Sequence, residues 1–184
     1  MTDRIATAVL PGGEILLRPV EAADLPLLRA WDADPVIEAL MGRRFAEQSP
    51  EEWFQGLRHQ RNARAWIIET GQRPVGEVEL AQINWRNGTA EIRICLGVKE
   101  CWGQGLGTAA MIHSLALAFE QMHLKAVYLR VFATNQRAIR LYERLGFRKQ
   151  GILPASVRRH DPAPVLLMNL PRHRWGAQQP VAVG

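Results

Sequence analysis

The sequence predicts a mixed α/β protein with a central sheet of about seven strands and about four helices. Three consecutive strand-like segments separated by turn signals lie between residues 65 and 98, and apolar residues alternate with others in the third segment, which is typical of an antiparallel meander. Beyond residue 105, helical and strand-like patterns alternate up to residue 170. The 184 residues suffice for one hydrophobic core, so we expect one domain over residues 1–175 and a flexible tail over 176–184.

The first part of the chain contains an opening strand and a pair of helices. The apolar segment Glu14–Val20 predicts the strand. Asp24 is a suitable cap for a short helix that includes Trp31. Ser49 is followed by a proline and then by Glu52, and this combination of cap, first helical residue and capping-box partner predicts a second helix.

Three strands follow and form the meander. The segments Ala65–Thr70 and Val75–Asn84 are separated by a Gly-Gln turn and predict a hairpin. Asn87 and Gly88 form a second, strong hairpin signal, because both residue types tolerate the positive φ that tight hairpin turns require. They lead into the strand predicted over Thr89–Val98.

The second half alternates helices with strands. A helix with regularly spaced apolar residues follows residue 105, and the strand Ala126–Phe132 comes next. Another helix, centred near Leu141, is expected to end at Gly146, since glycine readily adopts the left-handed conformation that closes helices. The segments Phe147–Leu153 and Val165–Leu170 complete the predicted sheet.

Composition restricts the classes of function. No apolar run approaches the ~18 residues of a membrane span, and the N-terminus lacks the layout of a signal peptide, so we expect a cytoplasmic protein without a membrane partner. Cys95 and Cys101 have no partner at metal-binding spacing, which predicts reduced thiols and no metal site. The net charge is −3 over residues 1–100 and +8 over residues 101–184. A basic half suits an anionic ligand, and nucleic acid is disfavoured because the basic residues form no long run.

The most informative segment is Cys101–Thr108, which places three glycines between a strand and a helix. Glycine lets the backbone turn sharply and approach a ligand, and the helix that follows presents unpaired amides and the positive end of its dipole. We therefore expect a cradle for a pyrophosphate, with an ordinary loop before a helix as the alternative. The Walker A triplet is absent, and the dinucleotide fingerprint would need glycine where Thr108 stands.

A second motif begins at Asn135, which can cap the next helix, and ends with Tyr142, Gly146 and Phe147. The two motifs together resemble the GNAT (GCN5-related N-acetyltransferase) superfamily, in which a turn of the form Gln/Arg-x-x-Gly-x-Gly/Ala precedes Tyr-x-x-x-Gly-Phe. The resemblance covers roughly residues 14–170. Trp102 departs from the general pattern, and Trp-Gly-x-Gly is typical of a branch that contains ribosomal-protein N-terminal and spermidine acetyltransferases.

The resemblance implies the GNAT fold, with a sheet splayed between its fourth and fifth strands, and acetyl-CoA as co-substrate. Backbone amides of the glycine turn would hold the pyrophosphate, and the pantetheine arm would lie in the splay beside the backbone near Leu96 and Val98. Asn135 would contact the same arm. The expected coenzyme-binding residues are Leu96, Gly97, Val98, Trp102, Gly103, Gln104, Gly105, Leu106, Gly107, Thr108, Asn135 and Ala138.

The resemblance also implies that Tyr142 is the catalytic acid, which protonates the departing thiolate. The attacking amine must lose a proton to a base. We expect Glu91 to be that base, with Glu77 and Glu79 as alternatives. Some relatives place a glutamate on the strand before the second motif, but the matching position here is Arg130.

Acidic residues outnumber basic ones in the region of the first helices. An acidic rim would attract a cation, so we expect the acceptor to be a primary amine, either a small cationic amine or a protein N-terminal amine. The alternative is a set of helix caps and solvated side chains. The residues concerned are Asp32, Asp34, Glu38, Glu47, Glu51 and Glu52.

Other readings of the function stay open. A covalent acetyl intermediate on Cys95 would need an activating histidine, and none stands at an obvious position. The chain could be a non-catalytic acyl-CoA-binding or sensor module, although Tyr142 argues against this, or an aminoglycoside-type resistance acetyltransferase. The sequence does not fix the acceptor or the oligomeric state, and the homodimer is suggested only by how common dimers are in this branch.

Overall fold

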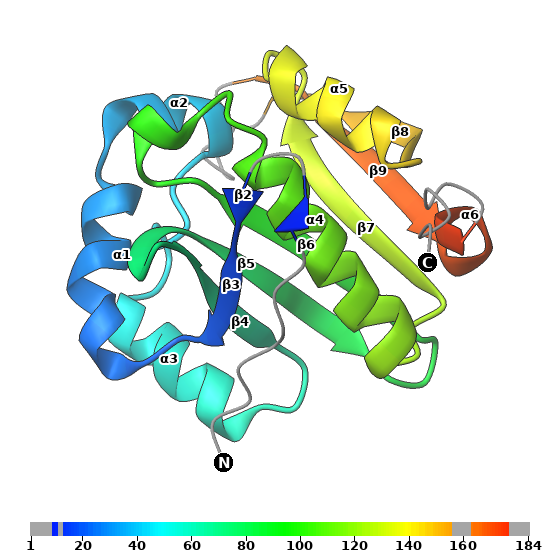
Figure 1. The fold of residues 1–184 in the computed structure, drawn as a ribbon. Helices are drawn as coiled ribbons and strands as arrows, with labels where there is room; N and C mark the ends of the chain where they lie inside the picture. The colour runs from blue at the N-terminus through cyan, green and yellow to red at the C-terminus, as the bar shows by residue number, and fades with distance from the viewer. Residues whose placement is uncertain (1–8, 11–12, 156–162, 177–184) are drawn as a thin grey trace.

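Seven strands form one mixed sheet in the order β3-β4-β5-β6-β7-β9-β8 (Figure 1). The structure is a computed structural model and describes residues 9–10, 13–155 and 163–176. The strands of the sheet are β3 (Leu16–Pro19), β4 (Arg64–Thr70), β5 (Arg73–Asn84), β6 (Thr89–Cys95), β7 (Ala126–Phe132), β8 (Arg148–Leu153) and β9 (Val165–Pro171). A separate antiparallel pair consists of β1 (Val9–Leu10) and β2 (Gly13–Glu14).

Six α-helices accompany the strands in the described part of the chain. They are α1 (Leu25–Asp32), α2 (Pro35–Met41), α3 (Pro50–His59), α4 (Leu106–Ala116), α5 (Gln136–Arg144) and α6 (Arg172–Gly176). Shorter helical segments are the 3-10 turns η1 (Ala22–Asp24) and η2 (Lys99–Cys101) and the π-helical segment η3 (Leu117–Gln121), which prolongs α4. The sequence indicated about four helices. It did not separate α2 and α6, because each is too short to show a clear period.

The two faces of the sheet carry two hydrophobic clusters. On β4, Trp66 and Ile68 belong to the cluster that contains α4 and α5, whereas Ala65 and Ile67 belong to the cluster that contains α1, α2 and α3. Successive residues of a strand point to opposite faces, so α4 and α5 cover one face and α1–α3 cover the other. Figure 1 shows α4 lying across the nearer face.

The sheet opens between its fourth and fifth strands. β6 and β7 run parallel but pair only over Thr89–Glu91 and Ala126–Tyr128. Beyond these residues β6 continues to Cys95 and β7 to Phe132 without pairing to each other, while β7 stays paired with β9 along its whole length. This arrangement confirms the mixed seven-stranded sheet and the splay that the family resemblance implied.

Of the two helix N-terminal caps predicted for the first part of the chain, one is present and one is not. The capping box at Ser49 is present: its hydroxyl accepts from the Glu52 amide at 3.2 Å, and the Glu52 carboxylate accepts from the Ser49 amide at 2.7 Å. Asp24 does not cap α1, because its carboxylate accepts from the Glu21 amide at 2.8 Å and binds Arg18. The expected opening strand is also split between β2 and β3, and β6 ends at Cys95 rather than at Val98.

Candidate active site

A cavity of about 1220 Å³ passes through the splay of the sheet. One part of its wall comes from the glycine turn and α5, and includes Gly103, Gly105, Gly107, Thr108, Ala138 and Tyr142. Another part comes from β5, β6 and the α1–α3 side, and includes Trp31, Phe45, Trp53, Glu77, Glu79 and Glu91. The two sequence motifs and the central strands therefore face one continuous space.

The glycine turn has the backbone geometry that its composition predicted. Gly103 and Gly105 both have a φ of 85°, in the left-handed region that residues with a side chain avoid. Gly105 is the N-cap of α4, and its carbonyl accepts from the Ala109 amide at 3.0 Å. The amides in the first turn of α4 are those that a helix leaves without helical partners, so this end of the cavity suits an anion.

The end of β6 is held by contacts that the sequence did not show. Trp102 donates from its indole Nε1 to the Leu96 carbonyl at 2.8 Å, and the Val98 amide donates to the Val75 carbonyl at 3.2 Å. Two backbone groups expected to face the coenzyme are thus already engaged within the protein. The Leu96 carbonyl can still accept a second hydrogen bond, because it has two lone pairs.

Asn135 fixes the start of α5. Its side-chain oxygen accepts from the Ala138 amide at 3.1 Å, and its side-chain nitrogen donates to the Leu40 carbonyl in α2 at 3.2 Å. The cap predicted from the sequence is therefore present, and the same side chain joins α5 to α2 beside the cavity. Asn135 and Ala138 both line the cavity.

Tyr142 lies on the buried side of α5 and lines the cavity. Its ring packs against that of Phe147, and the two ring centroids are 5.8 Å apart. Burial, with a smaller contribution from Cys95, raises the pKa of its phenol to about 12. The phenol is therefore protonated throughout the neutral range, as a proton donor must be.

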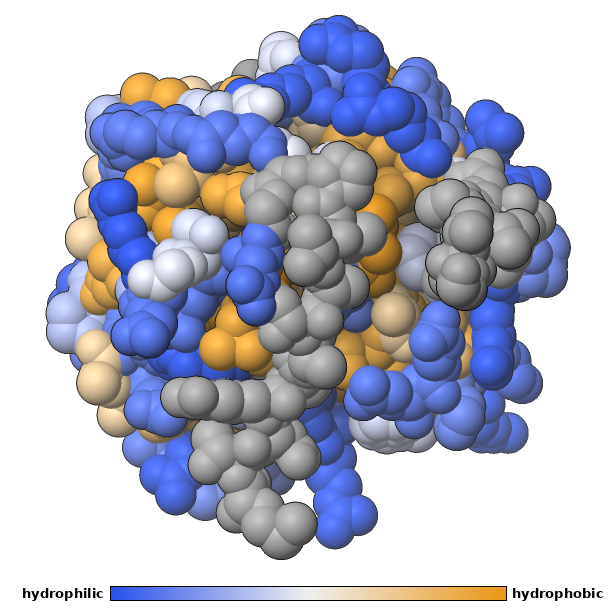
Figure 2. Space-filling model, viewed as in Figure 1, coloured by the Kyte–Doolittle hydropathy of each residue, from blue (hydrophilic) through white to orange (hydrophobic). Residues whose placement is uncertain are grey.

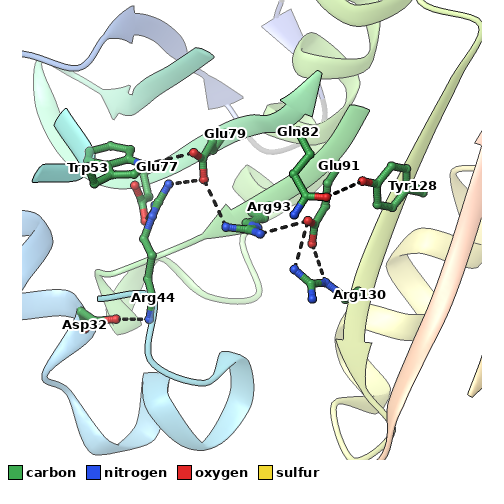
Figure 3. Close-up of polar contacts among 10 residues, drawn as sticks. All are labelled: Asp32, Arg44, Trp53, Glu77, Glu79, Gln82, Glu91, Arg93, Tyr128 and Arg130. Atoms are coloured by element: carbon green, nitrogen blue, oxygen red, sulfur yellow. Dashed lines mark hydrogen bonds and ion pairs between the residues drawn. The ribbon is translucent and has the colours of Figure 1, made fainter. Parts of the chain in front are cut away.

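Glu91 is buried on β6 and fully engaged with arginines (Figure 3). Arg130 donates to it at 2.8 and 3.1 Å, and Arg93 donates at 3.0 Å. Burial opposes ionisation of Glu91, but these hydrogen bonds outweigh it and hold its pKa below the ordinary value. A carboxylate in this state is a weak base, so the geometry does not favour the role that we expected for Glu91.

Cys95 is an unsuitable nucleophile in this structure. Its side chain is buried, and burial, reinforced by the nearby Glu77, raises the pKa of its thiol to about 12. The reactive form of cysteine is the thiolate, which is scarce at neutral pH under these conditions.

Most of the acidic side chains of the first helices have structural partners. Asp32 accepts from the amides of Arg44 and Phe45, and Asp34 caps α2 and binds Lys99 at 2.7 Å. Glu51 pairs with Arg29, and Glu52 closes the capping box of α3. The acidic rim is therefore largely made of caps and ion pairs, and it attracts cations less than the sequence suggested.

Eight of the twelve expected coenzyme-binding residues line the cavity, and the four that do not are Gly97, Val98, Gln104 and Leu106. Sequence reasoning gave no role to Arg44 or Arg137, which also line it. It named Trp53 among the aromatic residues that could line an acceptor site, with a place in the core as the alternative, and Trp53 lines the cavity. Arg44 stands in a loop without periodicity, and only the folded chain brings it to β5. Arg137 was visible as a basic residue inside the second motif. It is one of three exposed arginines of α5, where Figure 2 shows hydrophilic residues gathered at the top of the view.

Comparison with known families decides the class of this protein. The family model for the acetyltransferase (GNAT) domain matches residues 14–148. The chain belongs to the GNAT acetyltransferase family. It is an acetyl-CoA-dependent N-acetyltransferase, with acetyl-CoA as co-substrate. Within the described residues, no group of three or more His, Cys, Asp or Glu side chains is placed to hold a metal ion, and no helix has both the length and the apolarity to cross a bilayer.

Curated relatives and solved structures agree with this assignment. The acetyltransferase is 30% identical over 146 residues to spermidine N(1)-acetyltransferase of Escherichia coli. The match covers 76% of this chain and 75% of that protein. The chain is equally similar to an uncharacterized protein of Methanocaldococcus jannaschii, of whose length the match spans 28%. Spermidine N-acetyltransferase from Vibrio cholerae, solved with CoA and spermine, superposes with a TM-score of 0.76 at 26% identity, over 88% of this chain and 97% of that one.

Proposed function

We propose that this acetyltransferase transfers the acetyl group of acetyl-CoA to a primary amine, either a small cationic amine or a protein N-terminal amine, by direct attack in a ternary complex. One observation carries the proposal: a single cavity reaches from the glycine turn, past Tyr142, to the polar face of β5 and β6. Coenzyme and acceptor can therefore enter one space from different sides and meet at the splay.

The glycine turn supports binding of the coenzyme pyrophosphate. Amides from Gln104 to Thr108 would donate to its oxygens, at the positive end of the α4 dipole. Arg137 adds a cation beside the turn, because a side chain on Gly103 would lie 3.8 Å from its guanidinium. The pantetheine arm would then follow the splay past Leu96 and Asn135.

Tyr142 is proposed as the acid of the reaction. The amine nitrogen forms a bond with the thioester carbonyl carbon, the carbon–sulfur bond breaks, and the phenol of Tyr142 gives its proton to the departing thiolate. The amine meanwhile loses one proton to a base. With a pKa of about 12, the phenol of Tyr142 keeps its proton at every pH at which the enzyme would work.

An acceptor screen tests the proposal. Pure protein with acetyl-CoA would be offered polyamines, aminoglycosides, amino acids, alkylamines and N-terminal peptides, and release of the coenzyme thiol would be measured. We expect acetylation of at least one class and calorimetric binding of coenzyme A. Binding without thiol release for any amine would support the sensor alternative, and the absence of binding to folded protein would refute the proposal.

The homodimer stays a prediction from the family resemblance, and the cytoplasmic location stays a prediction from composition and the N-terminal sequence. A homodimer is tested by light scattering of the pure protein, and a cytoplasmic location by fractionation of the source cells. Neither property enters the proposed reaction.

A further inference from the structure

Side chains of alternating charge line the acceptor side of the cavity (Figure 3). Arg44 pairs with both Glu77 and Glu79, approaching Glu79 to 2.6 Å. Arg93 pairs with Glu79 at 3.8 Å and with Glu91 at 3.0 Å, and Arg130 pairs with Glu91 at 2.8 Å. We call this set the charge chain, and its members are Glu77, Arg44, Glu79, Arg93, Glu91 and Arg130. Three carboxylates meet three guanidinium groups, so the chain carries no net charge.

Arg44 is a fixed member of the charge chain. Its guanidinium lies 4.4 Å from the ring centre of Trp53 and 5.6 Å from that of Phe45, distances at which a cation is attracted to an aromatic face. Its backbone amide donates to Asp32 at 2.6 Å. These contacts hold the positive charge of Arg44 beside Glu77 and Glu79.

One buried oxygen of the charge chain is left over. Among the described residues, Oε2 of Glu77 has no hydrogen-bond partner, while its other oxygen binds Arg44. The side chain is only 8% exposed, and a buried carboxylate oxygen normally has a donor. Glu77 lies directly across the β5–β6 ladder from Cys95, which is followed by the Leu96 carbonyl at the splay. Burial also raises the pKa of Glu77, which indicates that the ion pair with Arg44 does not fully offset the loss of hydration of this carboxylate.

We propose that Oε2 of Glu77 binds the amino group of the acceptor, and that the balanced charge chain restricts the acceptor to a primary amine with one positive charge and an uncharged, partly apolar body. This inference rests on the proposed function and names its substrate class. The leftover oxygen accepts from one ammonium group, which must give up a proton to become the neutral nucleophile and loses a second proton as the amide forms. A second ammonium within the charge chain would lose its hydration beside three arginines, whose neighbouring carboxylates are already paired. Phe45 and Trp53 offer apolar surface for the rest of the molecule.

The proposed acceptor carries one positive charge, unlike the polyamine after which the relatives from Escherichia coli and Vibrio cholerae are named. A matched pair of amines tests this difference. Hexylamine and hexamethylenediamine have the same carbon chain and differ by one ammonium group. We expect kcat/KM for hexylamine to exceed that for the diamine and for spermidine by roughly tenfold. An equal or greater kcat/KM for the diamine or spermidine would overturn the inference while leaving the proposed function intact. If none of the amines supported thiol release, both the proposed function and this inference would be overturned.

Two variants test the residues separately. Arg44→Gln frees the carboxylates of Glu77 and Glu79, so the diamine should gain roughly tenfold in kcat/KM relative to hexylamine. Glu77→Gln should raise the KM for hexylamine by roughly tenfold and leave the affinity for coenzyme A unchanged. Arg29→Gln is the control, since it removes an arginine from an exposed ion pair outside the cavity. An unchanged diamine-to-hexylamine ratio in Arg44→Gln, or an unchanged KM in Glu77→Gln, would contradict the assignment. Should Arg44→Gln not fold, the wild-type comparison of the two amines still decides.

Discussion

Arg130 donates two hydrogen bonds to Glu91, from Nε to Oε1 at 2.8 Å and from Nη2 to Oε2 at 3.1 Å. Glu91 is the last residue of β6 that pairs with β7, and Arg130 stands two residues beyond its partner Tyr128. The ion pair therefore joins the two strands at the point where the sheet begins to open. This position gives Glu91 a structural task, which competes with the role of base.

The first prediction separates these two tasks. Glu91→Gln should lower the free energy of unfolding by about 1–3 kcal/mol, because hydrogen bonds to a charged group are lost beside two arginines. Turnover in the folded variant should stay within about threefold of wild type, since a base of lowered pKa contributes little. Urea unfolding and steady-state kinetics measure the two effects. Loss of turnover by orders of magnitude with an unchanged unfolding curve would restore Glu91 as the base.

The second prediction concerns acid stability. The folded-state pKa of Glu91 lies below its ordinary value of about 4.3. The stability that this carboxylate contributes is therefore complete above that pH and is lost as the pH falls through the lower, folded-state pKa. Wild type should lose more stability than Glu91→Gln between about pH 5 and pH 3. Parallel acid-unfolding curves for the two proteins would show that Glu91 contributes nothing to this loss.

The sequence predicted the sheet, the glycine turn and the Asn135 cap because these features depend on local patterns. The glycines around Gly105 and the cap at Asn135 act on the backbone of their own segments, so their effect can be predicted from the residues next to them in the sequence. The acceptor end could not be predicted in this way. Arg44 pairs with Glu77 across 33 positions of sequence, and Glu91 acquires Arg130 only through the β6–β7 ladder. Partners of this kind are set by register, which the sequence alone leaves open.

The third prediction concerns Tyr142. Tyr142→Phe keeps the ring packed against Phe147 and removes the proton, so kcat should fall by about 100-fold or more with little change in stability. Coenzyme affinity, measured by calorimetry, should not change. Because the pKa of this phenol is about 12, wild-type kcat should show no loss from phenol ionisation up to about pH 10. Full activity of the variant across the pH range would exclude Tyr142 from the chemistry.

The fourth prediction compares two glycines of the expected coenzyme site. A methyl group on Gly97 would overlap the indole of Trp31, so Gly97→Ala should destabilise the fold by about 1–3 kcal/mol. A methyl group on Gly107 would meet Leu96 at 3.5 Å, an ordinary contact. Gly107→Ala should therefore fold normally but bind coenzyme A more weakly, because Gly107 and Leu96 both line the cavity.

Thermal unfolding and calorimetric titration distinguish the two effects. Gly151→Ala is the matched control, since a methyl group there would meet nothing within 4 Å, and it should change neither quantity. Replacing Trp31 with leucine in the Gly97→Ala background should recover part of the lost stability, because the smaller side chain makes room for the methyl group. Normal stability of Gly97→Ala would mean that Trp31 does not pack on this glycine. Unchanged coenzyme affinity of Gly107→Ala would place the pyrophosphate away from the first turn of α4.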